Sequence, residues 1–408
     1  MATKKPTDRG PLTANEAFLE AMIRHQMGLI EFAGYVGSRV VGLLNRTEEE
    51  LADRIRSRLL NNTGLSTPAE VRRYEALIAL ITRIRTKAFT EATEEWSRQM
   101  VDLAKSEAQF INATTIATAP VVVQTALPTA LQLRRIALSR PFQGRILKDW
   151  ANTILSEDLA RIRGEIQAGM VAGETSANIA RRIVGTARLR GGDGVTEITR
   201  RAAMALTRTA TNHVATATRN EFLADNSDLF DEEQFVATLD SRTTLVCASN
   251  DGKRFPTGKG PMPPLHWNCR SLRVPVLDGQ VLSARPAKAI TEQQILREFN
   301  EANGTSARSR KELPRGTKGQ YDAYRRTRIR QMTGQVPGTT NYQTFLMNQS
   351  AEFQNDVLGI TKAKLFRDGG LTLDKFVARD GRELTLAQLA QRDAAAFRAA
   401  GLDPGDYL

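Results

Sequence analysis

The feature that most constrains the fold is a series of helix-start signals in the first third of the chain. Three residue pairs have the spacing of a capping box, in which a threonine and a glutamate satisfy backbone N–H groups at a helix start: Thr13 with Glu16, Thr47 with Glu50, and Thr67 with Glu70. Pro68 then occupies a first helical position, where its missing N–H costs nothing. Apolar residues follow at three- and four-residue steps, from Val71 through Ile84. Residues 13–118 are therefore predicted to form at least two long amphipathic helices, broken at 61–68.

Helical patterning continues from about residue 134. An apolar stripe that includes Trp150, Ile154 and Ile162 predicts a long helix to about Met170, then a turn and a shorter helix. A glycine-rich loop precedes another helix that ends near residue 225. From Gln234 the pattern changes to alternation, with turn signals at Asn250-Asp-Gly, which indicates short strands. The predicted fold class is mainly α: a long helical N-terminal region and helical bundle with a small strand-containing α+β module.

Changes in composition divide the chain into three parts. Residues 1–130 form the N-terminal helical region, which ends in an uncharged connector over 108–133. Residues 131–275 form the second helical part with its strand-containing module, and 276–408 begin as a loose linker and a basic segment and end in an ordered tail. The uncharged connector contains Pro120, Pro128 and several polar residues, so we do not expect it to span a membrane.

Charge and cysteine content limit the class of protein. The 408 residues contain 57 Lys and Arg against 45 Asp and Glu, a net charge of +12, which favours a polyanionic partner such as nucleic acid. Two cysteines cannot form a disulfide framework and fit synthesis in a reducing compartment. The first residues have no apolar core of a signal peptide behind their charges.

The densest chemistry of the chain lies in "PMPPLHWNCR", residues 261–270. Cys247, His266 and Cys269 offer three zinc ligands, whereas a closed site needs four, so Asp240, Asp251 or a water would have to complete it. A Cys247–Cys269 disulfide and a purely hydrogen-bonded turn are the alternatives. In each case the segment is interpreted as a structural knuckle, stiffened by its prolines. Its supporting residues are Asp240, Arg242, Pro263, Pro264 and Trp267.

A basic segment at 308–330 carries nine Lys and Arg against two acids, with Tyr321 and Tyr324 between them. Cations with interleaved aromatic rings suit a nucleic-acid backbone and a stacking surface, whereas a flexible solvated stretch is the other interpretation. The candidate nucleic-acid-binding residues are Arg308, Arg310, Lys311, Arg315, Lys318, Arg325, Arg326, Arg328 and Arg330.

No enzyme motif stands out. The sequence lacks a Gly-x-x-x-x-Gly-Lys phosphate loop and a Gly-x-Ser-x-Gly elbow. A cysteine–histidine pair lacks an identifiable orienting group and oxyanion donors, and the acids Asp231, Glu232 and Glu233 are adjacent, so they do not share one face. We therefore expect a non-enzymatic protein with no catalytic residue and no cofactor other than zinc.

The order of rare residues over 134–275 resembles the Mu F-like phage head morphogenesis (minor head protein) family. The matching elements are Asp240, Arg242, Thr243, Cys247, Asp251-Gly252-Lys253, Pro263-Pro264, His266 and Cys269-Arg270. Many relatives carry a second cysteine shortly before the position of Cys247, but here residues 243–246 contain none. The departure removes the easiest fourth zinc ligand. The tail after residue 353 is also similar to the ends of such phage proteins.

The resemblance implies a structural virion protein of a tailed bacteriophage, synthesised in the host cytoplasm and located in the phage head. It would contact the portal protein, the major capsid or scaffold protein and, without sequence preference, double-stranded DNA, in head morphogenesis or genome delivery. Alternatives are an internal protein ejected with the genome, for which membrane contact would matter, and a DNA-acting enzyme, a nuclease or toxin-like protein, fused to a phage head domain.

Overall fold

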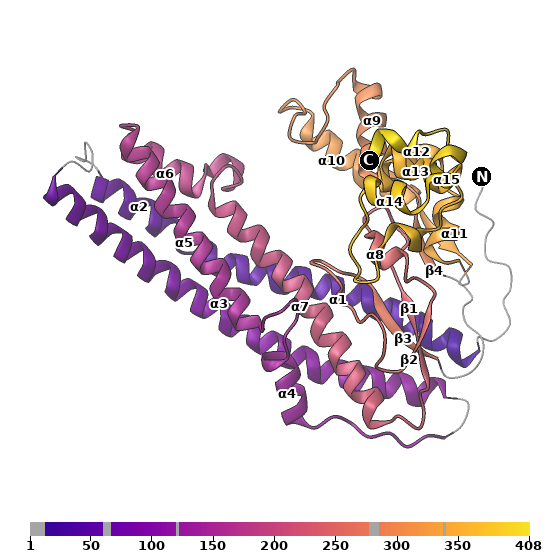
Figure 1. Ribbon diagram of the computed structural model, residues 1–408. Helices are drawn as coiled ribbons and strands as arrows, with labels where there is room; N and C mark the ends of the chain where they lie inside the picture. The colour runs from indigo at the N-terminus through magenta and orange to yellow at the C-terminus, as the bar shows by residue number, and fades with distance from the viewer. Residues whose placement is uncertain (1–12, 60–66, 120–121, 277–284, 338–339) are drawn as a thin grey trace.

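Four long helices lie side by side and form the elongated part of the molecule (Figure 1). The computed structural model describes residues 13–59, 67–119, 122–276, 285–337 and 340–408. The four helices are α1 (Ala14–Asn45), α3 (Pro68–Thr118), α5 (Leu147–Val171) and α7 (Thr196–Asp225). The 51 residues of α3 span about 76 Å at 1.5 Å per residue, so this helix is the backbone of the whole bundle.

One continuous apolar core joins these helices. Val36 and Val40 of α1 meet Trp96 and Met100 of α3 and Leu206 of α7, all less than 1% exposed. Trp96 also donates its indole N–H to the Thr207 hydroxyl at 2.7 Å, which satisfies the one polar atom that its burial removes from water. The core extends from residue 29 to residue 217 and crosses position 130, so the N-terminal region and the helices after it pack as one body.

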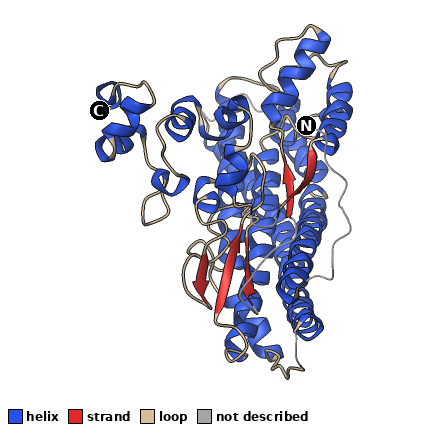
Figure 2. Ribbon diagram, turned by 90° about the vertical axis from the view of Figure 1, so that its right-hand side faces the viewer, coloured by secondary structure: helices blue, strands red, loops and turns tan. Residues whose placement is uncertain are grey.

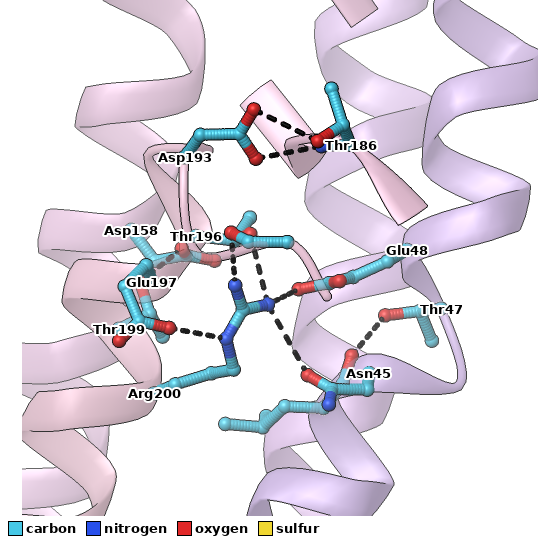
Figure 3. Close-up of polar contacts among 12 residues, drawn as sticks. Asn45, Thr47, Glu48, Asp158, Thr186, Asp193, Thr196, Glu197, Thr199 and Arg200 are labelled. Atoms are coloured by element: carbon cyan, nitrogen blue, oxygen red, sulfur yellow. Dashed lines mark hydrogen bonds and ion pairs between the residues drawn. The ribbon is translucent and has the colours of Figure 1, made fainter. Parts of the chain in front are cut away.

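Two arginines fasten the far end of the bundle, where α2 (Glu48–Leu59) and α6 (Ser176–Val184) pack together. Arg85, 1% exposed, pairs with Asp158 at 2.7 Å and donates to the Leu44 carbonyl. Figure 3 shows the second, Arg200, whose guanidinium bonds Glu48 at the start of α2 and Glu197 in its own helix. Both clamps tie the α1–α2 turn to later helices, because both arginines reach that turn.

The opposite end carries a small antiparallel sheet of order β2-β1-β3. Its strands are β1 (Glu232–Val236), β2 (Arg254–Pro256) and β3 (Leu272–Val276), with Gln234 opposite both Arg254 and Val274. Phe18 of α1, Phe222 of α7 and Phe230 pack against Val236 and Val274. The N-terminal end of α1 and the C-terminal end of α7 thus pack against the sheet. A short helix, α8 (Leu245–Ala248), lies in the β1–β2 connection, and α4 (Ala130–Ser139) joins α3 to α5.

The last third lies at the same end of the bundle as the sheet (Figure 1), and Figure 2 shows the C-terminus among short helices to one side of the strands. β4 (Arg285–Lys288) pairs with β5 (Thr333–Val336), and between them lie α9 (Glu292–Asn303) and α10 (Lys318–Gln331). A separate apolar cluster then holds the short C-terminal helices together. These helices are α11 (Tyr342–Met347), α12 (Ala351–Leu358), α13 (Ile360–Arg367), α14 (Leu386–Arg392) and α15 (Ala394–Ala399), with 3-10 turns at Leu373–Phe376 and Pro404–Tyr407. Another 3-10 turn, Ala187–Leu189, lies between α6 and α7.

The mainly α fold class with a small strand module is confirmed. The capping boxes at Thr13 and Thr67 form as predicted. The one predicted at Thr47 does not, because the Thr47 hydroxyl donates to the Leu44 carbonyl and accepts from Arg85 instead. The prediction of a loose linker was wrong for 285–288, since β4 is paired and Arg285 is 3% exposed. Residues 277–284 lie outside the described residues.

The uncharged connector contains the end of α3, which continues to Thr118, and an extended stretch before α4. Among the described residues, the stretch long and apolar enough to cross a membrane is instead Ala14–Leu59, near the N-terminus. Core helices of soluble proteins have the same length and composition, and α1 contributes to the bundle core. This feature alone is therefore weak evidence for a membrane span.

Candidate metal centre

The knuckle predicted at residues 261–270 is a turn held between α7 and the sheet. Asn212 of α7 donates from its side-chain amide to the carbonyls of Cys269 and Ser271, at 2.7 and 3.1 Å. The Asn268 backbone N–H donates to the Thr209 hydroxyl at 2.9 Å, and Asn268 itself has a positive φ of 59°. These bonds satisfy the backbone groups of a turn that lacks regular structure. Helix α7 therefore fixes the position of Cys269.

The three candidate ligands meet behind this turn. Cys247 lies on α8 and is 1% exposed, and Cys269 is 3% exposed. The Cys247 Sγ lies 3.3 Å from the His266 Nε2 and 3.7 Å from the Cys269 Sγ, and all three ligand atoms lie within 4.8 Å of one another. The structure thus brings together residues that are 19 and 22 positions apart in the sequence.

These distances fit the donor set of a tetrahedral zinc ion. Zn–S bonds of about 2.3 Å and Zn–N bonds of about 2.0 Å imply S···S near ~3.8 Å and S···N near ~3.5 Å in a tetrahedron. The two separations from the Cys247 Sγ differ from those values by about 0.1–0.2 Å, and the third pair, His266 Nε2 and Cys269 Sγ, lies within 4.8 Å. The His266 Nδ1 lies 2.9 Å from the Trp267 carbonyl, to which it donates, so Nε2 is left as the free nitrogen facing the sulfurs. Such a second hydrogen bond commonly orients a metal-binding histidine.

The three groups shift one another's pKa values. A hydrogen bond from Cys247 and the nearby His266 lower the pKa of the Cys269 thiol, while donating that bond and being buried raise the pKa of the Cys247 thiol. Burial opposes a charge on His266, but the interaction with Cys269 outweighs it and raises the histidine pKa. The lowered pKa of Cys269 has the direction that metal binding requires, since the thiolate is the form that binds metals.

The predicted fourth ligands are used elsewhere. The Asp240 carboxylate binds both guanidinium nitrogens of Arg270, at 2.7 and 2.8 Å. The Asp251 carboxylate likewise binds both nitrogens of Arg285 and accepts the backbone N–H of Tyr342. Both acids are occupied by cations, so of the three predicted fourth ligands only a water or another exogenous ligand is compatible with this arrangement.

A disulfide is not formed in this structure. Both cysteines are free thiols, and their sulfurs lie 3.7 Å apart, compared with about 2.05 Å in a disulfide. The hydrogen-bonded knuckle and the metal site use the same geometry and differ only in what lies between the three atoms.

The residues predicted to support the knuckle have distinct roles. Trp267 stacks edge-on against Trp150 of α5 with ring centroids 4.9 Å apart, and Pro263 and Pro264 are joined by a cis peptide bond. Asp240 is the partner of Arg270. The side chain of Arg242, in contrast, is 63% exposed and lies 3.9 Å from Asp240. No pattern in the sequence indicates Arg285 of β4 and Asn212 of α7, which hold the module, because only the fold brings them near it.

The basic segment is more ordered than a solvated stretch. Arg310, Arg325 and Arg328 form ion pairs with Asp322, Glu292 and Glu298. Tyr321 is 4% exposed, and the Tyr324 ring packs against Phe299 with centroids 5.7 Å apart while its hydroxyl bonds Glu298. Both rings are therefore packed against the protein. Lys318 donates to the Lys311 carbonyl. The side chains of five cations have no ion pair or hydrogen bond among the described residues: Arg308, Lys311, Arg315, Arg326 and Arg330.

The architecture is that of a helical scaffold protein, with a cysteine–histidine knuckle at one end of the bundle. Residues 160–273 match the family model described as Phage Mu protein F like protein. The match begins within α5 and ends in β3, so it includes α7 and the whole knuckle. The resemblance to the Mu F-like family is thereby confirmed over this segment, which indicates a phage protein related to the head. Searches of curated proteins and of solved structures gave no match.

Proposed function

We propose that the protein is a structural minor head protein of a tailed bacteriophage, which acts in head morphogenesis or genome delivery by binding the portal or the adjoining capsid. The Mu F-like match over 160–273 is the observation that carries this proposal. It covers the part of the chain where a rigid module is fixed to the end of a long helical rod, an arrangement suited to holding other proteins at a set distance.

A structural zinc ion in the knuckle is part of the proposal. The three donors fit zinc in type and spacing, and His266 is oriented by the Trp267 carbonyl. When bound, the ion would cross-link α8 to the 261–270 turn and stabilise a module with few apolar residues of its own. Cys247, Cys269 and His266 would hold it, with a fourth ligand from outside the three.

The proposed role is not enzymatic. Of the adjacent acids considered for a nuclease, Glu232 lies on the sheet near Arg254, and Glu233 is buried in an ion pair with Arg273 at 3.1 Å. Their side chains are used separately, whereas metal-dependent nucleases need carboxylates that converge on one ion. This supports a binding role over a DNA-acting enzyme.

Fractionation of purified virions tests the proposal. We expect the protein in intact heads, in association with the portal or the adjoining capsid. Absence of the full-length protein from purified virions would overturn the head assignment. Comparing emptied heads with ejected material separates a protein retained at the portal from the alternative of an internal protein ejected with the genome.

A further inference from the structure

A pocket of about 350 Å³ lies between α1, α7 and the knuckle. The candidate metal ligands His266 and Cys269 form part of its lining, and the proposed role assigns no ligand to the rest. One wall is apolar and consists of Leu29, Ile30 and Ala33 of α1 with Trp267 of the knuckle. Ile30 and Trp267 are 43% and 38% exposed, so they keep apolar surface in contact with water. Its volume is at the lower end for ligand sites, about 300–1,000 Å³, which is room for one or two side chains.

The other wall is cationic. Arg208 of α7 lines the pocket and has no ion pair or hydrogen bond among the described residues. Arg242 lines it too, and the acid nearest to it, Asp240, is already bound by Arg270. No carboxylate is present among the described residues that line the pocket. Two guanidinium groups are therefore available to an anion there.

We infer that this pocket binds a short peptide segment with an acidic side chain from a partner protein. A carboxylate forms bidentate pairs with arginine, and aliphatic side chains pack on the Ile30–Trp267 wall. A DNA phosphodiester matches only the arginines, because it has no aliphatic side chain for that wall. The inference concerns the pocket alone and does not depend on where the protein is located.

Fluorescence anisotropy with two labelled peptides tests the inference on the purified full-length chain. The probes are Gly-Leu-Asp-Leu-Gly, blocked at both ends, and the same peptide with Asn in place of Asp. We expect the Asp peptide to bind with a Kd at least about tenfold lower, because only its carboxylate pairs with the arginines. The double variant R208Q/R242Q should remove that difference, whereas Arg83→Gln, an exposed position on α3, should keep it.

The outcomes are distinct. Equal binding of the two peptides, no binding of the Asp peptide, or displacement of that peptide by a single-stranded oligonucleotide at lower concentration than by unlabelled peptide would each overturn the inference. Circular dichroism melting verifies that the variants are folded. If the protein binds the peptide but is absent from virions, the inference holds and the proposed function fails. If the protein is present in virions but does not bind the peptide, the inference fails and the proposed function holds.

Discussion

At the scale of single residues, the knuckle depends on contacts among Cys247, His266 and Cys269. Replacing both His266 and Cys269 by Ala removes two of the three converging donors and leaves Cys247 buried without its sulfur and imidazole partners. We expect the double variant to lower the free energy of unfolding of this module by about 1–3 kcal/mol for each lost buried interaction, while the bundle helices stay folded.

Hydrogen exchange of the 232–276 amides against those of α3 measures this difference, and Lys259→Ala in the same loop is the control. Metal analysis with thiol counting separates the three forms of the site. Zinc would give one ion per chain and a melting temperature that falls with a chelator; a disulfide would give no free thiol; hydrogen bonding alone would give two thiols and no metal. Unchanged exchange in the double variant would contradict the structural role.

Asp240 gives a second residue-scale prediction. Although burial opposes ionisation, the hydrogen bonds and charge of Arg270 hold the pKa of this carboxyl below its ordinary value. A lowered folded-state pKa adds stability above the unfolded pKa of about 3.9 and loses it as the pH falls through the folded-state pKa. Asp240→Asn should cost about 3–5 kcal/mol at pH 7, as for other broken buried pairs, and progressively less below about pH 4.

Urea unfolding of both proteins at pH 7 and pH 3 measures the change. The exposed Asp102, 3.5 Å from Lys105, is the matched control: Asp102→Asn should shift stability by under about 1 kcal/mol at either pH. A cost for Asp240→Asn that does not shrink with acid would show that its carboxylate charge does not contribute.

At the scale of elements, two glycines of α5 should respond oppositely to the same substitution. A Cβ at Gly169 would lie 2.5 Å from Ile179 Cγ1 of α6, whereas one at Gly164 meets nothing within 4 Å. Gly164→Ala should therefore stabilise the protein by about 0.5–1 kcal/mol through helix propensity. Gly169→Ala should destabilise it by about 1–3 kcal/mol, because α6 must move away. Thermal melting of the two variants checks both signs, and equal shifts would mean that α5 and α6 are not packed this closely.

The helices were predictable from the sequence to the extent that their signals are local. A capping box and an apolar stripe predicted α3, and an apolar stripe alone predicted the end of α5, since each signal lies within one segment. Thr47 failed because Arg85, 38 positions away, competes for its hydroxyl. β4 was missed for the same reason: its partner β5 lies beyond two helices, and Arg285 is explained only by Asp251. For the site, the sequence predicted which three donors converge. It did not predict that Asp240 and Asp251 form ion pairs with Arg270 and Arg285.

At the scale of the whole molecule, some of the positive charges are buried in ion pairs inside the protein and others are exposed to solvent. Many arginines are internal fasteners, including Arg85, Arg219, Arg273 and Arg285, each 3% exposed or less. Net charge therefore overstates how many cations are free for a polyanion. The five unpaired cations of 308–330 form a smaller set than the nine predicted from the sequence, and they define where DNA binding is testable.

We predict that the full-length protein binds duplex and single-stranded DNA without sequence preference and that binding weakens steeply with salt, because each neutralised phosphate releases condensed counterions. In gel-shift titrations at two salt concentrations, R326Q/R330Q should lower the slope of log affinity against log salt by up to about 1.8 on duplex DNA, close to 0.9 per lost contact. Arg72 and Arg73 of α3 are exposed and have no ion pair or hydrogen bond with the part of the chain that the structure describes. They give a control with the same charge change, and R72Q/R73Q should leave the slope unaltered. Equal losses in both double variants would mean that DNA senses only net charge. No binding at low salt would remove nucleic acid from the partners of this protein.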